Sequence, residues 1–230
     1  MIAAWQLPGL PPTLPKLRIP MNFGKTLLRQ KCDEVEPGMH MSLSPELKVG
    51  LKEWASVCSA LASGRQMVLL RKGGIHESDG EFELEHPQFL LFPTYLHQNL
   101  RMLKSSEHAD FEPASSEPSH VTLSLAGEVT SIIQLHSRRQ ADALDAEHIW
   151  TAPLIDMRFD YRPQNPLYLL LVRAYRLMNP ITVEITPAYA GCKSWVPLEQ
   201  SLSTADVRPA LALDEFERRS ASIHALLARA

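Results

Sequence analysis

The longest apolar run of the chain, residues 167–177, sets the strongest limit on its fold. Its composition of Leu, Val and Tyr is typical of a strand buried on both faces. Arg173 and Arg176 interrupt this run. Because an unpaired buried guanidinium is costly, Arg173 must either pair with a carboxylate or reach a polar pocket. The run therefore predicts a central strand and makes Arg173 a residue that needs an explanation.

Other segments show the shorter periodicities of strands and helices. We expect strands at 65–71, 81–85, 89–92, 120–125, 129–135, 181–186 and 194–198. A surface loop is expected at 105–119. Helices are expected at 44–61, 137–146 and 214–230, the last with Phe216, Ile223, Leu226 and Leu227 facing inward. Since strands and helices do not alternate regularly, the pattern predicts an α+β domain with a mixed, closed β-barrel sheet and peripheral helices.

The first helix carries the clearest local signals. Ser44-Pro45-Glu46 resembles a capped helix start, and Leu47, Leu51, Trp54, Cys58 and Leu61 follow at steps of three and four. Ser63-Gly64 can stop it. The interpretation is one amphipathic helix followed by a tight turn and a strand.

The N-terminal residues 1–45 differ in composition from the rest. They hold seven of the eighteen prolines and a net charge of +2, without sustained periodicity. We expect an extended leader, or a translation start at Met21, Met39 or Met41. The division predicted is therefore a leader (1–45), one globular domain (46–200), and a C-terminal linker and helix (201–230).

Charge and cysteine content exclude several classes of protein. The formal net charge is −3, so any nucleic-acid contact must be local rather than a general attraction to phosphate. Three widely spaced cysteines suit neither a disulfide framework nor a zinc site. No run is long enough to span a membrane. We expect a cytoplasmic protein without membrane contact, metal or cofactor.

A first cluster of candidate residues follows the strand at 65–71. Arg71 and Lys72 precede Gly73 and Gly74, and Glu77 comes shortly after. Two cations followed by bare backbone N–H groups can bind one anion. The alternative is a glycine hairpin turn without ligand. Walker spacing is absent from the sequence, so nucleotide triphosphate hydrolysis has no support.

A second cluster brackets the apolar strand at 89–92. His86 precedes it, and Tyr95 and His97 follow, so these side chains could line one end of the sheet. Their spacing is not that of a metal site, and the alternative is that both histidines are structural.

A third cluster joins cations to aromatic rings. Arg173, Lys193 and Trp195 offer charge and a π-face of the kind that holds a nucleobase. The alternative is that Arg173 pairs with a carboxylate, for which the candidates are Glu85, Asp156 and Glu184.

Motifs for catalysis are few. There is no nucleophile elbow and no His-Glu-x-x-His, and the one Glu-x-Lys opens the expected helix. A hydrolase of small nucleotides or amides would have to use Lys72, Glu77 and His86 or His97. A structural or interaction protein is a further alternative, in which the acidic strand at 81–85 guards a sheet edge.

The segments Leu51–Ala55, Leu61–Gln66, Leu69–Ile75, Glu85–Pro87, Phe92–Gln98 and Tyr189–Leu198 together resemble the bacterial family of domain of unknown function 1802. The resemblance covers about residues 47–198. Some members are associated with restriction-nuclease-like domains, which implies a role in restriction and modification and a nuclease partner.

The helix, the turn at Gly64 and the strand ending at Arg71 are also similar, in arrangement, to PUA-like barrels of the ASCH and EVE groups. Those groups bind RNA or modified DNA bases in a barrel pocket. The resemblance implies that Arg71, Lys72, Tyr95, Arg173 and Trp195 match that pocket. The leading expectation is therefore a non-catalytic module that recognises a base or nucleotide of DNA or RNA.

Overall fold

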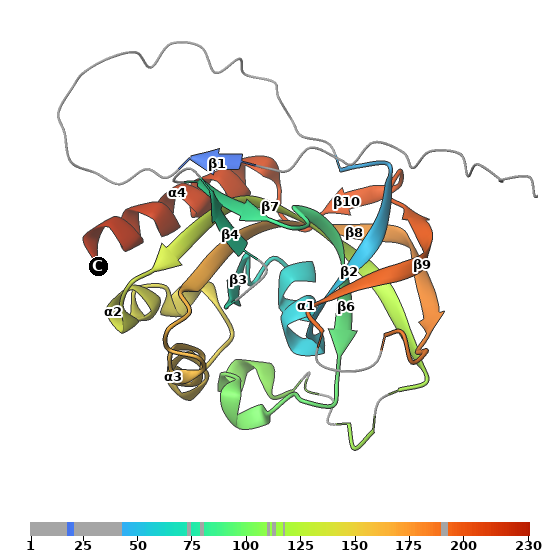
Figure 1. Cartoon of the computed structure of the whole chain (residues 1–230), viewed down its shortest axis with the longest axis horizontal. Coiled ribbons are helices and arrows are strands. Elements are labelled where there is room, and N and C mark those ends of the chain that lie inside the picture. The colour runs from blue at the N-terminus through green and yellow to red at the C-terminus, as the bar shows by residue number, and fades with distance from the viewer. Residues whose placement is uncertain are drawn as a thin grey trace, which may run out of the picture.

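The computed structural model describes residues 18–20, 43–72, 75–78, 81–109, 111, 114–116, 118–189 and 193–230 (Figure 1). Its helices are α1 (Ala55–Ala62), α2 (Arg138–Asp142), α3 (Ala152–Asp160) and α4 (Leu213–Arg229), with 3₁₀ turns η1 (Leu100–Met102), η2 (Ser105–Glu107) and η3 (Asp145–Glu147). Its strands are β1 (Arg18–Pro20), β2 (Glu46–Trp54), β3 (Val68–Arg71), β4 (Ile75–Ser78), β5 (Glu81–Leu84), β6 (Gln88–Thr94), β7 (His120–Leu135), β8 (Leu167–Glu184), β9 (Trp195–Ser203) and β10 (Val207–Pro209). Nearly all of the proline-rich leader lies outside the described residues.

A seven-stranded sheet forms the centre of the molecule. Its order is β10-β8-β7-β6-β2-β9, and β3 pairs with β8 alongside this path. Strands β2 and β6 run parallel, whereas the other neighbouring pairs of this sheet run antiparallel. Strands β1, β5 and β4 form a separate three-stranded sheet. The expected mixed α+β class is confirmed.

The sheet is not closed into a barrel, so that part of the prediction is wrong. Strand β9 ends one side of the sheet and β10 and β3 end the other, and no pairing between these ends is found among the described strands. Helix α1 contacts β2, β6 and β8 instead, with Val57, Ala60 and Leu61 fully buried.

The helix expected at 44–61 is also wrong in its first half. Residues 46–54 form β2, which pairs with β6 on one edge and β9 on the other. The spacing of Leu47 and Leu51 by four suits both a helix face and one face of a strand. Gly50 distinguishes the two, since a Cβ there would lie 3.1 Å from Val196 and 3.3 Å from Phe92, a close approach that favours glycine in this strand.

Helix α1 nevertheless ends where the sequence predicts. The backbone of Ser63 is helical and Gly64 follows at φ +72°, a conformation that glycine adopts without the steric cost of a Cβ. The Gly64 N–H donates to the carbonyl of Leu61 at 3.1 Å. The chain therefore turns from α1 into β3 within a few residues.

Two pairs of expected strands are each one long strand. Strand β7 spans 16 residues and β8 spans 18, and they pair along most of their length with register shifts near Leu123 and Val129. The short helix expected at 137–146 is present as α2 and η3. Helix α3 is missing from the sequence prediction, although Pro153 lies in its first turn, where proline suits a helix start.

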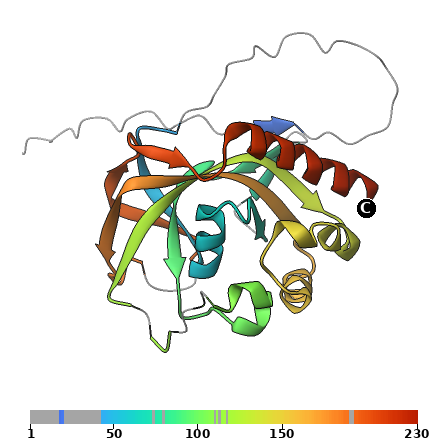
Figure 2. The ribbon, with the colours of Figure 1, turned by 180° about the vertical axis from the view of Figure 1, so that it is seen from behind.

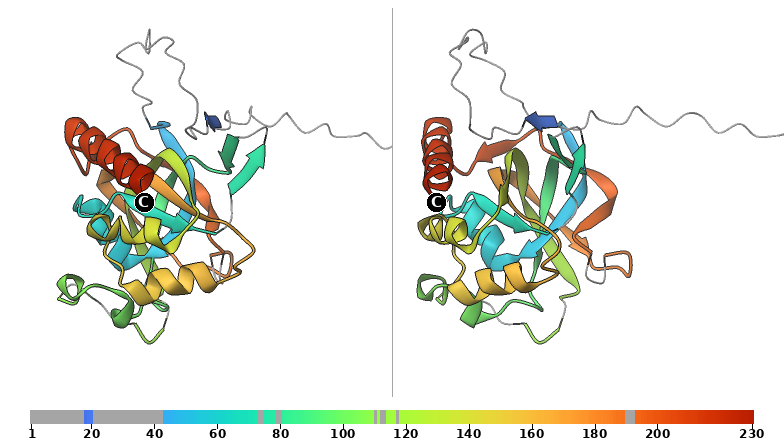
Figure 3. Two further views of the ribbon diagram at one scale, coloured as in Figure 1. Left: turned by 90° about the vertical axis from the view of Figure 1, so that its left-hand side faces the viewer. Right: turned by 60° about the vertical axis from the view of Figure 1, so that its left-hand side comes forward.

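Buried side chains lie on both faces of the sheet. The larger cluster joins α1, β3 and the inner faces of β7 and β8 to α2, α3 and α4, including Phe216, Ile223 and Leu227. Figures 1 and 2 show α2, α3 and α4 together on the side away from β9, and Figure 3 shows the C-terminal end of α4 beside α2. The smaller cluster lies on the opposite face and includes Leu90, Phe92, Tyr175 and Val196.

Candidate functional site

A pocket of about 460 Å³ lies beside the first turns of α1. Its lining comes from α1, from the turn after α1, from the segment after β6 and from η2 and the residues beyond it. These lining residues are Ala55, Ser56, Ser59, Arg65, Tyr95, Gln98, Glu107, Ala109 and Phe111. Its volume is in the range of pockets that bind small molecules.

Gln98 builds the wall of the pocket at the start of α1. Its Oε1 accepts hydrogen bonds from the backbone N–H of Ser56 at 2.8 Å and from the Ser56 hydroxyl at 2.6 Å. The amide of Gln98 therefore caps α1, which otherwise has no side-chain cap at Trp54. Because the oxygen is committed to α1, the two N–H donors of the same amide are its groups that remain for a ligand.

Arg65 and Glu107 form the charged part of the lining. Arg65 Nη1 lies 2.5 Å from Glu107 Oε2, and the side chains are 37% and 7% exposed respectively. Arg65 Nε also donates to the Ser63 hydroxyl at 2.9 Å. The pair leaves the pocket without net charge, so it suits a polar, neutral group better than a polyanion.

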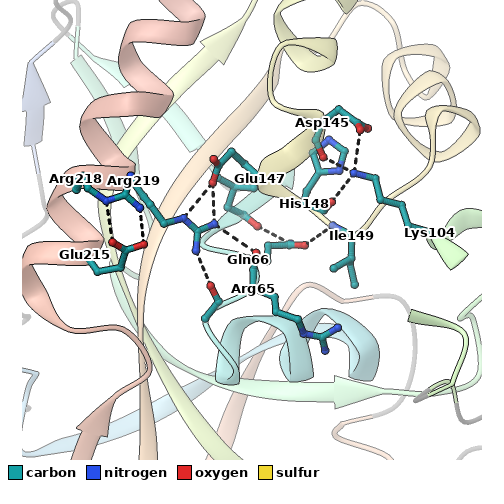
Figure 4. Close-up of polar contacts among 12 residues, drawn as sticks. Arg65, Gln66, Lys104, Asp145, Glu147, His148, Ile149, Glu215, Arg218 and Arg219 are labelled. Atoms are coloured by element: carbon teal, nitrogen blue, oxygen red, sulfur yellow. Dashed lines mark hydrogen bonds and ion pairs between the residues drawn. The ribbon is translucent and has the colours of Figure 1, made fainter. Parts of the chain in front are cut away.

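The turn that carries Arg65 is held by α4. Arg219 donates to the carbonyl of Gly64 at 2.6 Å and to Glu147 Oε2 at 2.7 Å. Figure 4 shows this guanidinium between the turn and η3, while Arg218 pairs with Glu215 along α4. The C-terminal helix thus positions the backbone from which Arg65 reaches the pocket.

Gln66 and Lys104 tie the same region to the segment around η3 (Figure 4). Gln66 accepts the N–H of Ile149 at 3.0 Å, and Lys104 Nζ donates to the carbonyl of His148 at 2.9 Å. Burial lowers the pKa of His148 to about 4, and the nearby charge of Lys104 acts in the same direction. His148 Nε2 is buried without a hydrogen-bond partner among the described residues, so this imidazole is kept neutral.

Arg71 and Lys72 lie at the end of β3 as predicted, but they point to different partners. Arg71 Nη1 lies 3.5 Å from Glu53 Oε2, with side chains 11% and 6% exposed. Lys72 Nζ donates to the carbonyls of Phe159 at 2.8 Å and Arg162 at 3.2 Å, at the end of α3. Gly73 and Gly74 lie outside the described residues, as does the side chain of Glu77.

Arg173 lies on the smaller core face, away from the pocket lining. The strand register places Glu128 opposite it, rather than Glu85, Asp156 or Glu184. Its guanidinium carbon lies 5.3 Å from the ring centre of Tyr175, and its Nε is buried without a hydrogen-bond partner.

Glu128 itself is held by two neighbours. Its carboxylate accepts from the Tyr175 hydroxyl at 3.0 Å and from Gln88 Nε2 at 3.1 Å. Burial raises the pKa of Tyr175, and the negative charge of Glu128 adds to this. Gln88, Glu128 and Tyr175 therefore form a hydrogen-bonded network around a buried carboxylate.

The remaining candidates are dispersed. His86 packs edge-on against Trp195 with ring centres 5.1 Å apart, while His97 and Lys193 are exposed. Neither hydrogen bonds nor ion pairs join Lys72, His86 and His97 within the described part of the chain. Because the side chain of Glu77 lies outside it, the hydrolase alternative stays a prediction. In the same part of the chain no three His, Cys, Asp or Glu side chains group as metal ligands would.

Of the eleven predicted site residues, Tyr95 lines the pocket. Gln98 belongs to the segment that follows the strand at 89–92, which the second cluster already included. The sequence did not single out Ser56, Arg65, Glu107 and Phe111, although Arg65 directly follows the turn at Gly64 and could have been noticed. Glu107 and Phe111 lie in a segment whose composition is typical of a surface loop, which concealed them.

Burial also sets the character of Cys58 on α1. Desolvation of the side chain is the larger effect and the negative charge of Glu53 the smaller one, and both raise the pKa of the thiol, which lies well above its usual value. The thiol is therefore poorly ionised at neutral pH, as expected for a structural cysteine.

No helix in the described ranges combines the length and the apolar character that a membrane crossing requires.

The sequence matches the model of one protein family. The model of the family described as domain of unknown function (DUF1802) matches residues 50–222, and so extends into α4 beyond the resemblance seen in the motifs. No curated protein matches the sequence.

Three solved structures are similar to the chain. One is ASCH from Zymomonas mobilis, at 10% identity and a TM-score of 0.35, covering 75% of this chain and 93% of that one. Two mutant forms of that protein give TM-scores of 0.33 and 0.34 at 10% and 11% identity, covering 75% and 78% of this chain and 96% and 99% of those. The match of the family model confirms the resemblance to DUF1802.

Proposed function

The chain belongs to the family described as domain of unknown function 1802, and we propose that it is a non-catalytic module that binds a nucleobase in the pocket beside α1. The base would belong to a nucleotide or to a single nucleic-acid strand. The observation that carries the proposal is the composition of the pocket: two aromatic side chains, an amide and a guanidinium–carboxylate pair around about 460 Å³.

The aromatic residues would provide stacking, which contributes to binding whichever base is present. Tyr95 and Phe111 lie in the same lining, and flat aromatic rings are the surfaces on which bases stack. Gln98 offers N–H donors, and Arg65 offers those of its guanidinium N–H groups that are not bonded to Glu107 or Ser63. Such groups can hydrogen-bond to the edge of a base.

The charge balance supports a base rather than a phosphate at this position. Arg65 and Glu107 compensate each other, so the lining has no net charge to attract phosphate groups. Binding should therefore depend only weakly on salt concentration. The predicted nuclease partner and the link to restriction and modification stay predictions alongside this proposal.

The test is a titration of the full chain with the four ribonucleoside monophosphates and with short single-stranded DNA and RNA, at two salt concentrations, by fluorescence anisotropy and calorimetry. Replacing Tyr95→Leu should weaken binding by roughly 5- to 150-fold, the range that corresponds to about 1–3 kcal/mol per stacked base. Tyr95→Phe should keep most of the affinity.

The matched control is Tyr161→Leu, since Tyr161 is 54% exposed on the segment after α3 and is not part of the lining. Saturable binding that Tyr95→Leu weakens and Tyr161→Leu does not would support the proposal. No saturable binding to any probe, or equal losses in the two variants, would refute it.

A further inference from the structure

A second group of charged side chains lies at the end of β3, apart from the pocket lining. It combines Arg71 of β3, Glu53 of β2 and Arg158 of α3, and we call it the Arg71–Arg158 cluster. None of the three residues lines the pocket beside α1. A ligand bound at this cluster would therefore be separate from a base bound in the pocket.

The position of α3 places the charge of Arg158 near Arg71. Lys72 Nζ donates to the carbonyls of Phe159 and Arg162, which fixes the end of α3 against the residue that follows Arg71. Arg158 precedes Phe159 in α3, and its charge is close enough to contribute to lowering the pKa of Arg71, after the larger effect of burial. The cation predicted to bind an anion, Lys72, is instead the anchor that places another cation beside Arg71.

Glu53 compensates only part of this positive charge. Its Oε2 lies 3.5 Å from Arg71 Nη1, and its Oε1 accepts the backbone N–H of Trp54 at 3.0 Å. The carboxylate thus divides its hydrogen-bonding capacity between the start of α1 and one guanidinium. Two guanidinium groups and one carboxylate leave a surplus of one positive charge in a largely buried cluster.

Arg158 carries the positive charge of the cluster for which no acceptor is found among the described residues. The residue is half-buried, and its Nε is buried without a hydrogen-bond partner among the described residues. A buried guanidinium donor without an acceptor is costly, so the arrangement is incomplete without a further acceptor. A negatively charged acceptor would satisfy this donor and compensate the surplus positive charge.

We propose that the Arg71–Arg158 cluster is a binding site for a phosphate group. A guanidinium donates two parallel N–H groups to oxyanions, and the oxygens of one phosphate can accept from two arginines at once. Glu53 holds Arg71 in place. The phosphate could be free or part of a nucleic-acid backbone, and both sources offer the same oxygens.

The experiment measures binding of inorganic phosphate to the full chain by calorimetry, together with thermal unfolding in phosphate and in chloride at equal ionic strength. The test variant is Arg158→Gln and the control is Arg162→Gln. Arg162 is exposed near the end of α3, and only its backbone carbonyl, which the substitution retains, contacts Lys72.

We expect phosphate to bind saturably and to raise the unfolding temperature above that in chloride. Arg158→Gln should weaken phosphate binding at least tenfold and abolish the phosphate-specific shift, whereas Arg162→Gln should keep both. Without phosphate, Arg158→Gln should unfold no earlier than the natural chain, because an unpartnered charge has been removed. Absence of saturable phosphate binding, or equal losses in the two variants, would overturn the proposal.

A competition arm identifies the source of the phosphate. If a thymidine oligonucleotide without terminal phosphate displaces inorganic phosphate, and Arg158→Gln abolishes this displacement, the site takes backbone phosphate. If it does not compete, the site takes free phosphate or a monoester. Tyr95→Leu should leave phosphate binding unchanged in either case, so failure of the base pocket and failure of this site are distinguishable.

Discussion

Gly64 offers a sharp test of how the turn after α1 is built. The residue has φ +72°, and a Cβ there would lie 2.5 Å from Cδ2 and 2.9 Å from Cγ of Leu211. Replacing Gly64→Ala should therefore add two penalties. Left-handed backbone costs an L-residue about 1–2 kcal/mol, and forcing a methyl group into a packed contact costs about 1–3 kcal/mol.

The sum is about 3.5 kcal/mol at the middle of these ranges, which for a chain of this size corresponds to a fall in Tm of about 7–14 °C. Thermal unfolding followed by circular dichroism, with urea unfolding as a second measure, would detect such a change. The double variant Gly64→Ala with Leu211→Ala separates the causes, because it removes the contact and leaves the backbone strain.

In that cycle, Gly64→Ala should cost less in the Leu211→Ala background than in the natural chain, with about 1–2 kcal/mol of backbone strain remaining. A loss below about 0.5 kcal/mol for Gly64→Ala alone would be no larger than that of an ordinary surface substitution, and would refute both the turn geometry and the contact with Leu211.

Three further outcomes are expected. The pKa of His148 is about 4 in the folded chain and 6.5 in the unfolded chain, so the unfolded chain takes up the proton first as the pH falls. The free energy of unfolding should therefore fall by about 3 kcal/mol as the pH drops from 6.5 to 4. Urea unfolding at several pH values should show this fall, and the variant His148→Gln should show a much weaker pH dependence. Tyr175→Phe removes a hydrogen bond to the buried carboxylate of Glu128 and should cost about 1.5–3 kcal/mol in urea unfolding, whereas an unchanged midpoint would mean that this bond is not formed. Arg219→Met should destabilise by about 2–3 kcal/mol, because Glu147 and the turn carbonyl lose a charged donor, and hydrogen exchange should then show α4 opening before β8; unchanged protection of α4 would contradict that role.

The parts of the fold that were predictable are those set by local chemistry. Leu167–Leu177 is apolar enough to require a buried strand, and Phe216, Ile223 and Leu227 are spaced so that one side of α4 is buried. Gly64 ends α1 because few other residues adopt its backbone conformation cheaply. These elements hardly depend on which distant segment they meet.

The sequence-based predictions were wrong where contacts with distant segments determine the structure. Residues 46–54 satisfy both a helical and a strand periodicity, and pairing with β6 and β9 selects the strand. The candidate site shows the same limit. Arg71 and Tyr95 are both chemically suitable, yet the structure assigns them to different places, since β3 meets Glu53 whereas Tyr95 faces the pocket.

The pairing of β2 also has a consequence for how the chain folds as it is synthesised. Strands β7 and β8 can meet soon after they are made, because 31 residues separate Leu135 from Leu167. Strand β2 appears early, yet its outer neighbour β9 begins only at Trp195. Until then that edge of β2 has no strand partner, and unpaired edges promote association between nascent chains. Folding should therefore be slow in its last step, and dependent on early protection of β2.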